Sequence, residues 1–184
     1  MRAKRIVDRS FTVINTPPIP WSKGREWREV NRIFDYHVEF AKATDGQLEI
    51  LAAILQKQFA SLYPMMEQLG TMTCSGCPDP CCLTAKPWFD YKDLLYLHLL
   101  NLPIPPGQPI TRLDGTCRYL RNRGCALARP VRPFICTWYC CPTQTRRLKN
   151  ENRRINLNPD GSLARIKQLR IDLENRFIAS LIAG

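Results

Sequence analysis

Apolar residues recur every three or four positions along two successive segments in the first half of the chain. In the first segment, from Arg25 to Ala43, they are Trp27, Val30, Phe34, Val38 and Ala41. In the second segment they are Leu48, Leu51, Leu55, Phe59, Leu62, Met66 and Leu69. This period places the apolar side chains on one face of an α-helix. We therefore predict two amphipathic helices that form a helical hairpin over residues 22–70, with both apolar faces in the core.

Two local signals refine the second helix. Thr44 and Gln47 have the spacing of a capping box, in which two side chains bond reciprocally to backbone N–H groups at a helix start. Pro64 lacks a backbone N–H, and we expect it to kink or restart the helix.

The rest of the chain predicts further helices around irregular segments. Residues 1–21 are expected to form an irregular arm, because a proline-rich run closes it. Residues 87–100 are apolar on most faces and predict a short buried helix. A basic helix is expected from Thr143 to Arg154. The overall prediction is a mainly α single domain over residues 1–184.

The C-terminal segment, residues 143–184, ends in a further predicted helix. The turn residues of 158–161 precede it, and Ser162 is a suitable N-cap. Its apolar face comprises Leu163, Ile166, Leu169, Leu173, Phe177 and Leu181. The alternative is a β-hairpin that pairs residues 155–157 with residues 163–165.

Nine cysteines give the chain its chemical character. Four lie in residues 74–82 and five in residues 117–141: Cys74, Cys77, Cys81 and Cys82, then Cys117, Cys125, Cys136, Cys140 and Cys141. Glycine and proline surround the first group and keep it out of regular structure. Closely spaced thiolates in loops are typical ligands of zinc and of iron–sulfur clusters. Residues 74–141 are therefore predicted to form an irregular cysteine-rich metal-binding centre.

The sequence also favours metal over disulfides. The N-terminal residues lack the apolar run of an export signal, and no stretch approaches the ~20 apolar residues of a membrane span. Together with the odd number of cysteines, these features predict a cytoplasmic protein without a membrane partner. Thiols stay reduced in the cytoplasm.

The formal net charge is +11, and part of the excess lies among the cysteines. The arginines concerned are Arg112, Arg118, Arg121, Arg123, Arg129 and Arg132. Cations stabilise nearby thiolates, so we interpret this arginine belt as compensation for an anionic metal site. A surface that binds a polyanion is the less favoured alternative.

Adjacent cysteines constrain how the ligands are shared. Successive side chains of an extended chain point to opposite faces, so Cys81 and Cys82 cannot easily bind one tetrahedral ion together. The same holds for Cys140 and Cys141. We therefore predict either two neighbouring four-thiolate sites or one cluster supported by a second set of thiols.

The order C-x2-C-x3-C-C, Gly115-Thr116-Cys117, Gly124-Cys125 and Arg132-Pro133-Phe134-Ile135-Cys136 resembles the CxxCxxCC cysteine-cluster family. Members of that family are described as zinc- or iron-chelating domains or YkgJ-type iron–sulfur proteins. The resemblance covers residues 74–141. It implies eight metal ligands: Cys74, Cys77, Cys81, Cys82, Cys117, Cys125, Cys136 and Cys140. The chain departs from the family pattern by one extra residue before Cys81 and by the additional Cys141.

Three functions remain open at this stage. The favoured one is an iron–sulfur centre, expected to be [4Fe–4S], that transfers electrons to a protein redox partner or supports an oxidoreductase. The second is a structural zinc module that recognises a protein or nucleic acid through its basic surface. Nucleic-acid binding is not favoured. In the third, the cysteines are reduced core residues and occasional disulfides.

Other polar residues give no catalytic constellation. His37 is expected at the surface or core edge, and His98 as a satisfied core histidine rather than a ligand. Asp90 and Asp93 are interpreted as charges that complement a helix N-terminus, not as an acid–base pair. Trp138 and Tyr139 would shield a cluster from water or belong to the core.

Overall fold

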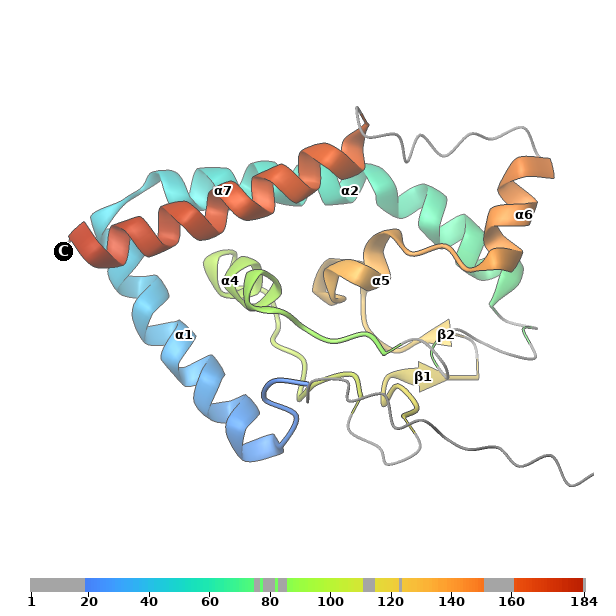
Figure 1. Cartoon of the computed structure of the whole chain (residues 1–184), viewed down its shortest axis with the longest axis horizontal. Coiled ribbons are helices and arrows are strands. Elements are labelled where there is room, and N and C mark those ends of the chain that lie inside the picture. The colour runs from blue at the N-terminus through green and yellow to red at the C-terminus, as the bar shows by residue number, and fades with distance from the viewer. Residues whose placement is uncertain are drawn as a thin grey trace, which may run out of the picture.

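Helices make up most of the structure (Figure 1). The computed structural model describes residues 19–74, 77, 82, 86–110, 115–122, 124–150 and 161–183. Within these ranges the mainly α-helical prediction is confirmed. Most of the predicted N-terminal arm, the last residues of the predicted basic helix and most of the predicted turn lie outside the described residues.

The two N-terminal amphipathic helices are confirmed as α1 (Gly24–Thr44) and α2 (Gln47–Thr73). Their predicted apolar faces are buried, except for the half-buried Leu51. Two residues, Asp45 and Gly46, connect the helices, which diverge from this connection (Figure 1).

The predicted start of α2 is wrong. Thr44 is the last residue of α1, and its hydroxyl donates to the Phe40 carbonyl at 3.1 Å. The carboxylate of Asp45 accepts the N–H of Gln47 instead, at 3.0 Å. The helix also continues through Pro64 as one element, so it does not restart there. Buried neighbours such as Leu62 and Met66 hold this part of α2 against the protein.

Two further helices complete the core. In α4 (Tyr91–Leu99) every residue from Asp93 onward is buried, which confirms the predicted buried helix. The last helix, α7 (Ser162–Ala183), packs along α2 and α1 (Figure 1). Residues 163–165 are helical, so the alternative β-hairpin is wrong. The packing of α4 against α1, α2 and α7 unites the apolar faces in one core.

A buried ion-pair network joins α7 to the start of α4. Arg170 is only 3% exposed, and its guanidinium donates to Asp90 and Asp93, at 2.7 Å in each case. Asp90 and Asp93 also form a reciprocal capping box, which confirms their expected place at a helix N-terminus. Burial raises the pKa of Asp93 to about 6, and the Arg170 charge opposes that rise.

The same network holds the start of α5 (Phe134–Trp138). The Phe134 N–H donates to Asp93 at 3.1 Å, and the Arg170 guanidinium lies 4.4 Å from the centre of the Phe134 ring. One carboxylate therefore fixes two helix N-termini and one arginine.

Short elements connect the helices. A two-stranded antiparallel ladder, β1 (Leu120–Arg121) with β2 (Gly124–Cys125), precedes the 3-10 helix η1 (Arg129–Val131). The basic helix α6 (Pro142–Asn150) follows α5, as predicted. No helix among the described residues has the length and apolar character needed to cross a membrane.

We expect Arg170→Met to lower the free energy of unfolding by about 3–5 kcal/mol, because it leaves the buried Asp93 carboxylate without its cation. The control is Arg176→Met on the same helix, which removes a solvent-exposed pair with Asp45 and should cost much less, because water screens that pair. Urea denaturation followed by circular dichroism measures both changes. Equal losses in the two variants would contradict the structural role of Arg170.

Candidate metal centre

The described cysteines lie on segments at one side of the molecule. They come from the C-terminal end of α2 and the loop after it, the β1–β2 region, α5 and the segment that enters α6 (Figure 1). The structure describes eight of them: Cys74, Cys77, Cys82, Cys117, Cys125, Cys136, Cys140 and Cys141. Cys81 lies outside the described residues.

Cys82, Cys117 and Cys125 pack in or against the main core, and Cys136 lies close enough to Cys117 and Cys125 to feel their charges. We name these four the inner thiols. The Cys117 N–H donates to the Cys82 carbonyl at 3.0 Å, which joins the two halves of the cysteine sequence through the backbone. Cys125 lies opposite Leu120 in the ladder. Burial raises the pKa of Cys136 to about 12, and the nearby Cys125 and Cys117 raise it further.

Local backbone structure explains how Cys117 and Cys125 come together. Cys117 forms an isolated antiparallel bridge with Ile110, and the N–H of Arg118 donates to Pro109 at 2.8 Å. The chain then reverses through β1 and β2, where Gly124 has a φ of 111° that other residues rarely adopt. This reversal brings Cys125 back beside the segment that carries Cys117.

The other four, which we name the outer thiols, lie where α2 ends and α6 begins: Cys74, Cys77, Cys140 and Cys141. Cys74 caps α2 through an N–H bond to Gly70 at 2.8 Å, and the Cys77 N–H donates to Cys74 at 3.4 Å. Burial raises the pKa of Cys140, and the neighbouring Cys141 adds to the rise.

Gln144 connects the two segments that carry the outer thiols. Its amide nitrogen donates to the Cys74 sulfur at 3.8 Å, and its amide oxygen accepts the Cys141 N–H at 3.1 Å. The side chain is buried at 6% exposure. Cysteine spacing alone did not predict this residue. Its position three residues after Cys141, at the start of a helix, is the available signal.

Two arginines of the predicted belt lower the pKa of one thiol in each group. Arg132 lowers the pKa of Cys136, against the effect of burial, and Arg129 does the same for Cys140. Arg129 also bonds to Glu67 at 2.8 Å, which holds η1 against α2. Arg112 and Arg123 lie outside the described residues.

The sulfur donors of this region are of the type that soft metals prefer, because thiols from two sequence segments lie beside arginines. Among the described residues, however, no three potential ligand side chains are placed to bind one ion together. The structure therefore groups the thiols without assembling a closed coordination sphere from the described residues.

The histidines take no part in these groups. His98 is buried, with Nδ1 at 2.7 Å from Asp35 Oδ1 and Nε2 at 2.8 Å from Asn31 Oδ1, which confirms it as a satisfied core residue. His37 is half-buried on α1 beside Tyr36, at the edge of the core as expected. The predictions for both histidines are therefore confirmed.

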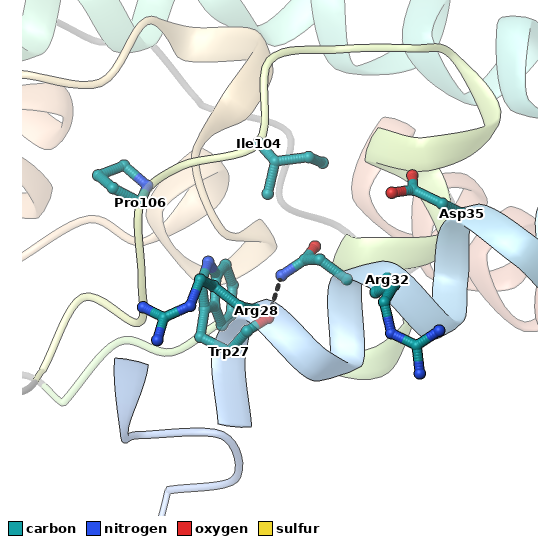
Figure 2. Close-up of a pocket in the computed structure, with 7 residues that line it drawn as sticks. Trp27, Arg28, Arg32, Asp35, Ile104 and Pro106 are labelled. Carbon is teal, nitrogen blue, oxygen red and sulfur yellow. Dashed lines mark hydrogen bonds between the residues drawn. The ribbon is translucent and has the colours of Figure 1, made fainter. Parts of the chain in front are cut away.

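A surface cleft of 410 Å³ lies between α1 and the loop 104–106 (Figure 2). Its floor is fixed by the Trp27 indole, which donates to Pro105 at 2.8 Å, and by Asn31, which donates to the Trp27 carbonyl. Arg28 and Arg32 lie on its rim, and Arg32 pairs with Glu29. None of the lining residues is a cysteine, so the cleft is separate from the candidate centre.

Comparison of the chain with protein-family models, with curated proteins and with solved structures finds no match. The residues themselves therefore carry the functional argument.

Metal binding should depend on pH in a defined direction. Because the pKa of Cys136 and that of Cys140 are raised, both thiols hold their protons at neutral pH and must release them when a metal binds. We expect the apparent zinc affinity to rise by about tenfold per pH unit for each proton released. Competition with a chromophoric chelator across about pH 6.5–8.5, corrected for the chelator's own protonation, measures the slope. An affinity that does not change with pH would contradict thiol ligation.

Proposed function

We propose that this chain is a thiolate metalloprotein whose centre is an iron–sulfur cluster, with a role in electron transfer or in supporting a redox enzyme. The observation that carries the proposal is the gathering of eight cysteines, from short elements and the segments between them, at one side of a helical core. When bound, such a cluster would accept and release single electrons at a potential set by its surroundings.

The arrangement of the thiols argues against ordinary core cysteines. Of the eight described cysteines, only Cys117 is fully buried, and the others are half-buried. A cysteine that serves only packing gains nothing from such places, because burial is what makes the thiol useful as a small apolar group. A metal bound by several of these cysteines would explain both their clustering and their partial exposure.

Three features of the chain favour an iron–sulfur cluster as the group that these cysteines bind. The candidate ligands are all thiols, the usual ligands of these clusters. The charges of Arg132 and Arg129 lower the pKa values of Cys136 and Cys140, respectively. Positive charge beside a cluster stabilises its reduced form. The resemblance of residues 74–141 to the CxxCxxCC family adds support.

A structural zinc module is the second candidate, and α6 favours it. This helix begins directly after the outer thiols and exposes Arg146, Arg147 and Lys149 to solvent. Zinc at the outer thiols would fix the orientation of a basic helix, which suits the recognition of an acidic partner.

Anaerobic purification followed by an absorption spectrum and analysis of iron, zinc and acid-labile sulfide separates these candidates. We expect a broad band near ~400 nm, with iron and sulfide in matching amounts. A colourless protein that contains zinc would replace the iron–sulfur proposal with the structural zinc module. A protein that carries neither metal would overturn both.

We expect Cys125→Ser or Cys77→Ser to lower both the metal content and the solubility of the purified protein, because each removes one proposed ligand. His37→Gln is the matched control, since it removes a potential ligand side chain on α1 that takes no part in the thiol groups. The measurement is metal per chain after purification under identical conditions. Unchanged metal content in both cysteine variants would contradict the proposed ligands.

A further inference from the structure

The outer side of α1 carries a row of apolar side chains that the described part of the chain leaves exposed. The helix itself lies at the edge of the molecule (Figure 1). Ile33, Tyr36 and Phe40 are all exposed, Tyr36 to 71%, and the exposed Ala43 follows them. We name these four residues the α1 seam. The five side chains that α1 buries in the core lie on a different face of the helix. A contiguous apolar patch on a protein surface is typical of a binding site.

The spacing of the α1 seam indicates what kind of partner it fits. Its members are three, four and three residues apart, as are the a and d positions of a heptad repeat. Side chains with this spacing pack into the gaps between the side chains of a second helix that lies alongside. The partner of the α1 seam should therefore be another α-helix.

The charges of α1 make it complementary to itself in the antiparallel orientation. Basic residues outnumber glutamates by four to two over residues 23–34, and carboxylates outnumber lysines by two to one over residues 35–44. That one lysine, Lys42, is mostly covered and lies between Glu39 and Glu49. A second α1 that runs in the opposite direction brings the basic half of each helix to the acidic half of the other.

One register satisfies the apolar and the charged positions together. In an antiparallel pair, a positions pack against d positions, and charged side chains on the same flank of the two seams face each other. When Ile33 packs against Tyr36 of a second copy, Arg32 lies beside Glu39 of that copy. Two-fold symmetry repeats both contacts. The side chains of Arg32 and Glu39 are each 73% exposed, so both can reach across the interface.

We propose that two copies of this chain associate through α1 in an antiparallel helix pair with two-fold symmetry. The α1 seam forms the apolar centre of the interface, and Arg32 of each copy pairs with Glu39 of the other. The cysteines take no part, so this inference is independent of the proposed metal centre. A typical stable interface buries about 800 Å² per partner, more than one short seam offers. We therefore expect a weak dimer, with a dissociation constant on the order of 100 µM.

Sedimentation velocity of the full chain between about 10 µM and 1 mM tests the proposal. A thiol reductant is present, so that cysteines do not cross-link the copies. The wild type should pass from monomer to dimer over this range. Arg32→Glu and Glu39→Arg each place like charges opposite one another at two symmetric contacts. Each should weaken association by about tenfold or more.

A mixture of these two variants gives the decisive comparison. In their heterodimer, the glutamate introduced at position 32 of one chain faces the arginine introduced at position 39 of the other. The native Glu39 of the first chain faces the native Arg32 of the second. The mixture should therefore associate as strongly as the wild type, although neither variant does so alone. Association of the mixture no stronger than that of the separate variants would overturn the antiparallel pairing.

A substitution in the α1 seam and a matched substitution elsewhere locate the interface. Tyr36→Asp should leave the chain monomeric, because it places a carboxylate in the apolar centre of the helix pair. Ile178→Asp changes an isoleucine that is exposed on α7 and should retain wild-type association. Circular dichroism checks that both variants fold. A wild type that stays monomeric at about 1 mM would overturn the proposal. So would a dimer that Ile178→Asp abolishes and Tyr36→Asp leaves unchanged.

Discussion

The buried Arg170 ion pairs are the interaction on which the arrangement of this molecule depends. Two carboxylates at the start of α4, Asp90 and Asp93, hold the guanidinium of α7. Asp93 in addition binds the first N–H of α5, the helix that carries Cys136. A single network in the core therefore fixes the helix that carries Cys136, although none of its members is a candidate ligand. Because charges buried this way are stable only when paired, the geometry of the network is strongly constrained.

The helix α2 connects the two parts of the molecule. Its first turns belong to the main core, where Leu48 and Leu55 are fully buried, and its last turns carry Met66 and Leu69 into the small cluster beside α6. The helix ends at Thr73, and Cys74 caps it. The helical core folds by apolar packing, and a metal bound by the thiols, as proposed, would hold together the cysteine-bearing segments beside it. Metal would therefore contribute less to folding here than in a small zinc peptide, which has no such core.

The sequence predicted the parts of the fold that depend on periodic burial. The spacing of residues such as Trp27, Phe34 and Leu55 identified α1 and α2 because each helix hides one face. The residue whose side chain bonds to the start of α2 was predicted wrongly. Both Thr44 and Asp45 are suitable helix-capping residues, and capping preference does not decide between two adjacent candidates. The ladder β1–β2 has only two residues on each strand, too few for an alternating pattern to appear. The grouping of the thiols depends on tertiary contacts such as the hydrogen bonds of Gln144 to Cys74 and Cys141, which cysteine spacing does not encode.

X-ray absorption spectroscopy at the edge of the metal in the protein as isolated would test the central claim most directly, because it reports the ligand atoms without any substitution. The account predicts a first shell of sulfur only, at about 2.3 Å. A first shell dominated by nitrogen or oxygen, at about 2.0–2.2 Å, would contradict a centre built from these cysteines.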